Sequence, residues 1–344
     1  MGHPVAVCRV ADLEEAVDDV AAATGFSGVV RVDRGGQVQL AKAYGWAHRG
    51  LRVPNSVHTR FGLASGTKSL TALTVVALIE AGGLSLATTA RSLLGQDLPL
   101  IDDGVTVEHL LAHRSGIGDY FDEDVVESMT DYVMPVPVHR LATTPDYLAV
   151  LDGHAQRSTP GERFAYNNGG YVVLALLAER ATGTPFPELV RTLVCAPAGM
   201  RYTEFLRSDE PDERTALGYL DADGLRTNVL HLPVRGSGDG GIHSTADDVH
   251  ALWSALAGGR IVPAARLAEL VRPRSGPPTG SMRHGLGSWL HPTGDAVIMD
   301  GSDAGVSFRS VHDPATGVTR TVLSNTTAGA WPVVRRLAEL LERP

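Results

Sequence analysis

A serine and a lysine three residues apart are the side chains of this sequence best suited to do chemistry. Ser65 and Lys68 stand in the run Phe-Gly-Leu-Ala-Ser-Gly-Thr-Lys at residues 61–68. At positions i and i+3 of a helix, two side chains lie on one face, so the Lys68 amine can reach the Ser65 hydroxyl. A serine hydroxyl is a weak nucleophile at neutral pH and needs an adjacent group to take its proton. The spacing therefore predicts a nucleophilic serine with a lysine partner.

Taken alone, this spacing is more often a helix start with a solvated lysine. The residues that follow favour the catalytic interpretation, because apolar positions recur at helical spacing until Gly82 and Gly83 end the pattern. We expect a buried helix over residues 65–81. Its N-terminus would place free N–H groups and the positive end of the helix dipole beside Ser65.

Bulk properties narrow the range of functions. The chain has 344 residues, enough for one large domain or two smaller ones, and its net charge of −9 argues against a nucleic-acid partner. Residues 1–20 lack the basic and then apolar pattern of a secretory signal, and no apolar window of about 18 residues occurs. We therefore expect no membrane association and a cytoplasmic location. Cys8 and Cys195 are expected to be free thiols rather than a disulfide.

Hydrophobic periodicity places the elements around this motif. The N-terminal part predicts a helix and three strands, at residues 10–24, 29–32, 37–44 and 60–63. Helical patterns dominate the middle of the chain, at residues 107–112, 145–151, 170–181 and 187–194, with a long loop at 119–144. The C-terminal part predicts two helices, at 246–256 and 331–341, and four strands, at 285–290, 296–299, 306–312 and 319–324.

This order predicts an α/β (α+β) fold with a single catalytic domain over residues 1–344. An antiparallel sheet flanked by helices is built from both chain ends, at about 1–87 and 236–344. An all-helical lobe is expected at about 88–235, with the site between the two parts.

Five segments, in chain order, resemble motifs of the serine β-lactamase-like family, especially its class C β-lactamase, D-aminopeptidase and family VIII esterase branch. They are residues 59–68, 105–117, 160–168, 197–200 and 240–248. The first holds the S-x-x-K signature of the penicillin-recognising enzymes. The resemblance extends from about residue 28 to 325, and it implies the β-lactamase/transpeptidase-like fold and an acyl-enzyme formed at Ser65.

Tyr166 and Asn168 lie in the segment that matches the family pattern P-G-x-x-F-x-Y-x-N. A neighbouring ammonium such as Lys68 stabilises a phenolate, so we expect a lowered pKa for Tyr166. Tyr166 would then accept the Ser65 proton and return it to the leaving group. The alternative is a buried tyrosine with one hydrogen bond. In the family, the residue that matches Asn168 binds the substrate amide or supports the lysine. Whether Lys68 or Tyr166 is the base stays open.

One motif departs from the family. Members carry Lys-Thr-Gly or His-x-Gly on the strand beside the nucleophile, with a further glycine four residues on. Gly301 and Gly305 keep that spacing, so Met299 stands where the basic residue would be. Methionine carries no charge and cannot pair with a substrate carboxylate, and it would at most line the substrate site or pack in the strand. The resemblance implies an oxyanion hole from the Ser65 and Ser302 amides, with Gly301 allowing close approach.

These residues predict a serine hydrolase acting on a small-molecule acyl substrate. β-Lactams and D-peptides carry a carboxylate near the scissile bond, so we expect an esterase acting on small acyl esters. The alternatives are an acyltransferase with residues 119–144 as a lid, a β-lactamase or D-aminopeptidase, and a non-catalytic binding descendant. No cofactor and no metal are expected, because the His109/His113 pair lacks the glutamate of H-E-x-x-H and has Leu110 in its place. The sequence does not indicate an oligomeric state.

Overall fold

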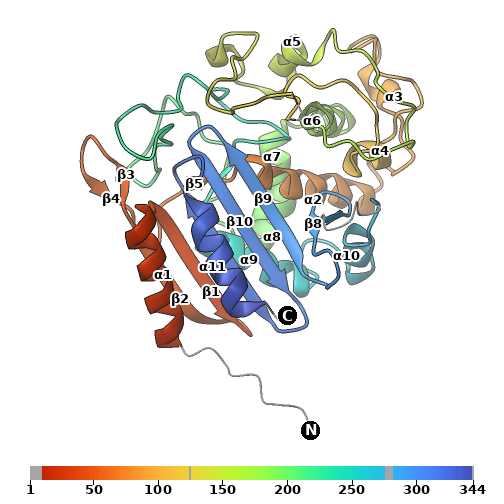
Figure 1. Ribbon diagram of the computed structural model, residues 1–344. Helices are drawn as coiled ribbons and strands as arrows, with labels where there is room; N and C mark the ends of the chain where they lie inside the picture. The colour runs from red at the N-terminus through yellow and green to blue at the C-terminus, as the bar shows by residue number, and fades with distance from the viewer. Residues whose placement is uncertain (1–9, 124, 276–281, 343–344) are drawn as a thin grey trace.

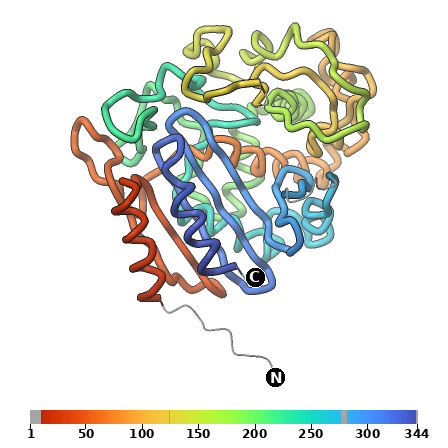
Figure 2. Tube along the Cα trace, in the orientation of Figure 1, coloured from red at the N-terminus to blue at the C-terminus, as the bar shows by residue number. Residues whose placement is uncertain are grey.

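One large antiparallel sheet organises the computed structural model, which describes residues 10–123, 125–275 and 282–342. Its seven strands run in the order β2-β1-β11-β10-β9-β8-β7. The strands are β1 (Gly28–Arg34), β2 (Gln37–Tyr44), β7 (Arg283–His284), β8 (Trp289–Leu290), β9 (Val297–Asp303), β10 (Val306–Asp313) and β11 (Val318–Ser324). Figures 1 and 2 show that strands from the two ends of the chain lie side by side in this sheet.

Helices cover both faces of the sheet. On one face, α1 (Val10–Thr24) and α11 (Ala330–Leu341) lie next to each other (Figure 1). Their apolar residues, with those of the strands beneath, form a separate core that includes Leu13, Val30 and Val333. On the other face lie α2 (Thr67–Glu80) and α9 (Ala246–Ala257). The helix α2 is buried almost throughout, as an apolar run of that length requires.

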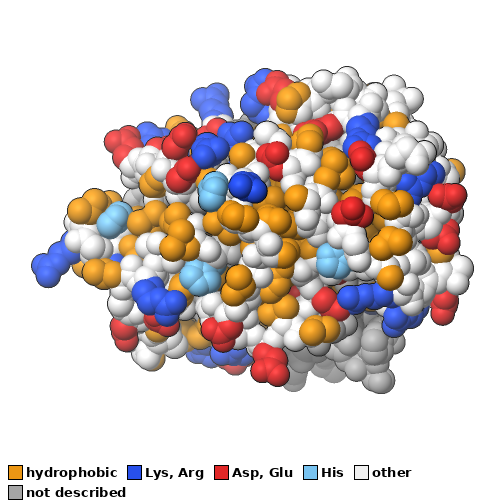
Figure 3. Space-filling view, turned by 90° about the horizontal axis from the view of Figure 1, so that it is seen from above, with side chains coloured by type: hydrophobic (Ala, Val, Ile, Leu, Met, Phe, Trp, Pro, Cys, Tyr) orange, Lys and Arg blue, Asp and Glu red, His pale blue; other side chains and the backbone are white. Residues whose placement is uncertain are grey.

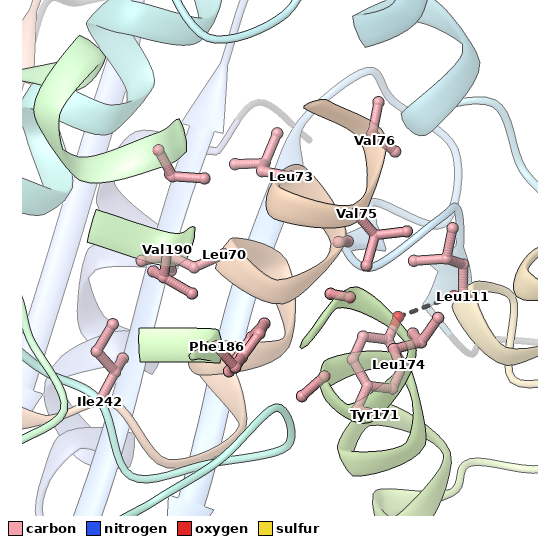
Figure 4. Close-up of a cluster of buried hydrophobic side chains, with 14 of the residues drawn as sticks. Leu70, Leu73, Val75, Val76, Leu111, Tyr171, Leu174, Phe186, Val190 and Ile242 are labelled. Carbon is pink, nitrogen blue, oxygen red and sulfur yellow. Dashed lines mark hydrogen bonds between the residues drawn. The ribbon is translucent and has the colours of Figure 1, made fainter. Parts of the chain in front are cut away.

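A second group of helices gathers around α6 (Asn168–Thr182) and α7 (Phe186–Val190), and these two pack on α2. The others are α3 (Ala90–Leu94), α4 (Val107–Leu111), α5 (Leu148–Leu151) and α8 (Ala196–Ala198). Leu70 of α2, Leu174 of α6 and Phe186 of α7 meet in one core (Figure 4). In the same core Tyr171 donates a hydrogen bond to the Leu111 carbonyl at 2.8 Å. Because α2 and α6 share this core, the start of each helix is held close to the other.

Short elements complete the frame. They are β3 (Trp46–His48), β4 (Val53–Pro54), β5 (Phe61–Gly62), β6 (His243–Ser244), α10 (Ala264–Leu270), a π-helical turn at Arg191–Cys195 and 3₁₀ turns at Ala64–Gly66, Val138–Arg140 and Thr144–Tyr147. The strand β5 pairs with β6 and leads directly into the turn Ala64–Gly66 and then α2. Over the described residues, no helix is long and apolar enough to cross a membrane. Cys195 is buried with a free thiol, and Cys8 lies outside the described residues.

The predicted fold class is confirmed, and individual elements differ in instructive ways. The predicted helix 10–24 and strand 37–44 have the predicted bounds. The predicted strand 285–290 is wrong over most of its length, because only Trp289 and Leu290 pair as β8. Gly287 there adopts a φ of +93° and passes against Ala72 of α2, which breaks the ladder. Residues 199–235, expected within the helical lobe, form neither a helix nor a named strand.

Candidate active site

Ser65 stands at the junction between a sheet strand and a buried helix. The 3₁₀ turn Ala64–Gly66 follows β5 and leads into α2, so Ser65 lies just before the first turn of α2, which carries Lys68. Ala64 takes a φ of +44°, a region that costs an alanine about 1–2 kcal/mol. Ser65 itself is partly exposed and lines a large pocket. A strained residue beside an accessible hydroxyl is a pattern found at functional sites.

Lys68 is buried, and its amine has three partners. The Nζ atom lies 2.8 Å from Ser65 Oγ, 2.7 Å from Asn168 Oδ1 and 2.9 Å from the Asp239 carbonyl oxygen. The last two oxygens can only accept hydrogen bonds. A neutral amine has two N–H groups and one lone pair. It would therefore donate to Asn168 and Asp239 and keep its lone pair for the Ser65 hydroxyl proton.

The surroundings of Lys68 favour that neutral form. Burial lowers the pKa of Lys68 below its usual value. The nearby carboxyl groups of Asp239 and Glu123 oppose this shift but do not reverse it. The protein therefore offers a lysine that can act as a base at lower pH than a solvated lysine can.

Asn168 is held in one orientation by the chain around it. Its Nδ2 donates to the Phe121 carbonyl at 2.8 Å and to Glu123 Oε1 at 3.1 Å, which leaves Oδ1 for Lys68. Its backbone N–H, at the start of α6, donates to the Asp119 carboxyl at 2.6 Å. Burial raises the pKa of Asp119 to about 7, although backbone N–H groups of the helix start oppose this. Asp119 thus anchors the helix end that presents Asn168.

Tyr166 lies beside this group, but its pKa moves in the direction opposite to the prediction. Its ring faces Lys68, whose Nζ is 5.0 Å from the ring centroid, and it stacks on Trp289 at 5.8 Å. Burial raises the pKa of Tyr166 well above 10, and the Glu123 charge adds to this, whereas the contact with the Ser65 hydroxyl lowers it. The expected phenolate is therefore wrong. Burial and the Glu123 charge favour a protonated phenol, which can donate a proton.

The strand β9 supplies the groups opposite Ser65. His291 N donates to the Ala296 carbonyl at 2.9 Å, and Ile298 pairs with Trp289 of β8. In an antiparallel ladder every second residue turns its N–H group to the same side of the strand, so the even-numbered residues of β9 turn theirs to the side of β8. Ser302 is one of them, and β8 does not extend that far. At Gly301, an added Cβ would lie 2.9 Å from Ser65 N, so the strand and the serine approach more closely than any side chain allows. The arrangement fits an oxyanion hole from the Ser65 and Ser302 amides.

Met299 does not line the pocket of Ser65. It is 1% exposed and belongs to the main hydrophobic core. Its side chain contributes to a separate apolar cavity with Leu73 of α2 and Trp253 of α9. The prediction that Met299 contacts substrate is therefore corrected. A charged residue there would have to be buried in the core, which explains why an apolar side chain suits this position.

The pocket of Ser65 is a partly open cleft, and its volume of about 1310 Å³ includes space open to solvent. Residues from the loop 119–144 form one wall with Phe121, Met129 and Tyr132, and the irregular segment 199–242 forms another. Among the described lining residues, Arg207 carries the only guanidinium or ammonium group, and it pairs with Asp209. Figure 3 shows a band of hydrophobic side chains across the face seen from above. The cleft therefore suits an apolar group better than an anion.

Comparison with known proteins gives the family. The family model described as Beta-lactamase matches residues 13–343. The chain belongs to this family. It is thus a serine hydrolase of the β-lactamase fold, as the resemblance of the motifs implied.

Relatives within the family have different activities. The chain is 31% identical to the esterase EstB of Burkholderia gladioli, over 64% of this chain and 63% of the relative. A penicillin-binding protein structure from Bacillus halodurans is 33% identical with a TM-score of 0.89, over 94% of this chain and all of that one. A D-amino acid amidase structure from Ochrobactrum anthropi is 26% identical with a TM-score of 0.76, over 95% and 97%. The matches span 67%, 52% and 63% of the lengths of three curated relatives.

For this β-lactamase-family chain, the structure adds residues that the motifs did not single out. Asp119 anchors Asn168, and the Asp239 carbonyl itself accepts from Lys68, yet each stands in a loop without a helical or strand pattern. The Gly-rich run at 236–241 was the one signal that pointed to Asp239. His109 and His113 do not share a helix face, since α4 ends at Leu111 and His113 has a φ of +53°. Within the described residues, no group of three metal-binding side chains occurs.

Proposed function

We propose that the protein hydrolyses small acyl esters through an acyl-enzyme at Ser65. The observation that carries this proposal is the set of contacts at Lys68 Nζ, where two fixed acceptors leave one position for the Ser65 hydroxyl. That arrangement is what a lysine needs to act as the general base for serine attack.

The residues take the following roles. Ser65 Oγ attacks the acyl carbonyl while its proton passes to neutral Lys68, and the Ser65 and Ser302 amides stabilise the oxyanion. As the tetrahedral intermediate collapses, Tyr166 donates a proton to the leaving alkoxide and regains one from the Lys68 ammonium. Deacylation runs by the same route in reverse. Water attacks the acyl carbonyl and gives its proton to Tyr166, which passes its own to Lys68; as the acyl–Oγ bond breaks, Lys68 returns a proton to Ser65 and the acid leaves.

The charges of the cleft support an uncharged ester over a β-lactam or a D-peptide. A substrate carboxylate needs a cation, and the described lining offers only Arg207, which already pairs with Asp209. Glu123, Asp239 and Asp303 also line the cleft, and each of these carboxyl groups repels an anion when it is ionised. EstB, an esterase by name, is among the relatives that match.

Acyl transfer to an alcohol is the second candidate, and one observation favours it. The wall from loop 119–144 brings Phe121 and Tyr132 together, with their ring centroids 4.6 Å apart, over the cleft that holds Ser65. Aromatic side chains there would exclude water and favour an organic acceptor. Adding a short alcohol to the assay separates the two, since a transferase would form a new ester at the expense of free acid.

The test is turnover of p-nitrophenyl acetate and butyrate beside a chromogenic β-lactam and a D-amino acid amide, with the Ser65→Ala variant as control. We expect Ser65-dependent release of nitrophenol that exceeds β-lactam and amide hydrolysis by at least about 10²-fold in kcat/KM. Faster hydrolysis of the β-lactam or the amide would overturn the ester assignment and leave the nucleophile in place. Release unchanged in Ser65→Ala would overturn the nucleophile as well.

A further inference from the structure

His113 contacts the ring of the candidate acid Tyr166 and the backbone of the residues before and after it. The Ala165 N–H, one residue before Tyr166, donates to the His113 carbonyl at 2.8 Å. The Asn167 N–H, one residue after it, donates to His113 Nδ1 at 3.1 Å. Between these two bonds the imidazole packs on the Tyr166 ring, with 4.4 Å between centroids. One residue thus holds the backbone on both sides of Tyr166 and one face of its ring.

The conformation of His113 is itself costly. The side chain is 1% exposed, and the backbone adopts a φ of +53°, which is unfavourable for any residue with a Cβ. Its Nε2 atom is buried without a hydrogen-bond partner in the described part of the chain. An unpaired buried N–H costs about 1–3 kcal/mol. A histidine kept here at such a cost is better explained by what its ring and Nδ1 do than by core packing.

The hydrogen bond from Asn167 also fixes the protonation of the ring. Nδ1 must carry a lone pair to accept it, so the single ring proton is on Nε2. Burial lowers the pKa of His113 well below its usual value, and His284 and Lys68 add to this, which keeps that tautomer neutral. A protonated ring would set two N–H groups against each other and push residue 167 away.

We propose that His113 is a positioning residue for Tyr166 in the reaction proposed above. It sets the place of the phenol relative to Ser65 and Lys68 through the Asn167 hydrogen bond and through ring contact. His113 does not touch the substrate or exchange a proton. This inference rests on the proposed role of Tyr166 and adds a residue from a different segment, the turn after α4, to the machinery.

Two substitutions separate the two contacts. His113→Phe keeps a ring and loses the acceptor, whereas His113→Asn loses the ring and keeps an acceptor near the Nδ1 position. With p-nitrophenyl acetate we expect His113→Phe to lower kcat about 10²-fold with KM changed less than about threefold, because a misplacement of about 1 Å has that effect. We expect His113→Asn to recover about tenfold, the value of one hydrogen bond. Leu110→Ala, a buried change in α4 shortly before His113, controls for destabilisation and should leave kcat within about threefold.

A double-mutant cycle decides whether His113 acts through Tyr166. In a Tyr166→Phe background, His113→Phe and His113→Asn should have no further effect on kcat. Additive losses, a loss mainly in KM, or an equal loss in Leu110→Ala would overturn the proposal. The rate of Ser65 phosphonylation by a phosphonate diester, whose alkoxide leaving group needs the Tyr166 proton, gives the same cycle without turnover. Lack of ester hydrolysis by the wild-type protein would then refute the proposed function alone, and the cycle would still test His113.

Discussion

Gly301 is the position where one added methyl group should damage the active site most. An alanine Cβ there would lie 2.1 Å from the Leu63 carbonyl oxygen and 2.9 Å from Ser65 N. Real Cβ atoms stay at least 3.0 Å from other heavy atoms, so β9 and the serine turn must separate by about 1 Å. Both atoms in the way are backbone atoms, so no side-chain rotation relieves the clash.

That separation opens the oxyanion hole, because one donor lies on each of the two segments that move apart. Loss of one such donor costs about 10²–10³ in kcat, or about 2.7–4 kcal/mol of barrier. We expect Gly301→Ala to lower kcat for p-nitrophenyl acetate by about that factor while the protein stays folded. The measurement is kcat and KM together with the thermal unfolding midpoint.

Gly83→Ala is the matched control for this change. The nearest atom to its added Cβ is the Leu78 carbonyl oxygen at 3.6 Å, an ordinary contact, and it lies at the far end of α2. We expect kcat within about twofold of wild type. If Gly301→Ala keeps full activity, β9 does not contribute to the oxyanion hole and the assignment of Ser302 is refuted.

Three further predictions concern charge and packing. Acylation should speed up as pH rises through the lowered pKa of Lys68, since only the neutral amine is a base. The Lys68→Arg variant carries a side chain that is always protonated, so its kcat should fall about 10²–10⁴-fold. If Lys68→Arg has the kcat and the pH–rate profile of wild type, Lys68 is not the base. Met299→Ala should lower the free energy of unfolding, measured in urea, by about 2–5 kcal/mol and leave kcat/KM near that of wild type. A variant that loses activity but keeps its stability would show that Met299 contacts the substrate. Burial raises the pKa of Asp303 to about 7, so the native state holds its proton more tightly than the unfolded chain and stability is lost as pH rises from about 4 to 7. Asp303→Asn should not show that loss, and its unfolding free energy minus that of wild type should grow across this window; a constant difference would contradict the shifted pKa.

Local patterns were enough to predict the scaffold. The helix at Val10–Thr24 and the strand at Gln37–Tyr44 follow from periodicity that the core then uses. The placement of Ser65, Lys68 and Asn168 in one hydrogen-bonded group was also expected, because helix spacing and the ordered motifs both pointed to it.

Features that depend on distant segments were not predictable in this way. The pKa of Tyr166 was predicted in the wrong direction, because neither its burial nor the approach of Glu123 is visible in sequence spacing. Gly287 ended a predicted strand because α2 passes against it, and Met299 faces the core because of the register of β9. In each case a contact between segments far apart in sequence overrode the local pattern.

The most direct test of this account is the intact mass of the protein after brief incubation with p-nitrophenyl butyrate at neutral pH and an acid quench, followed by peptide mapping. We expect one butyryl group on the peptide that contains Ser65, and none in Ser65→Ala, because the proposed route requires a covalent acyl-enzyme. An adduct on another residue, or Ser65-dependent ester hydrolysis in which Lys68→Met acylates as fast as wild type, would contradict the central claim that Lys68 activates Ser65.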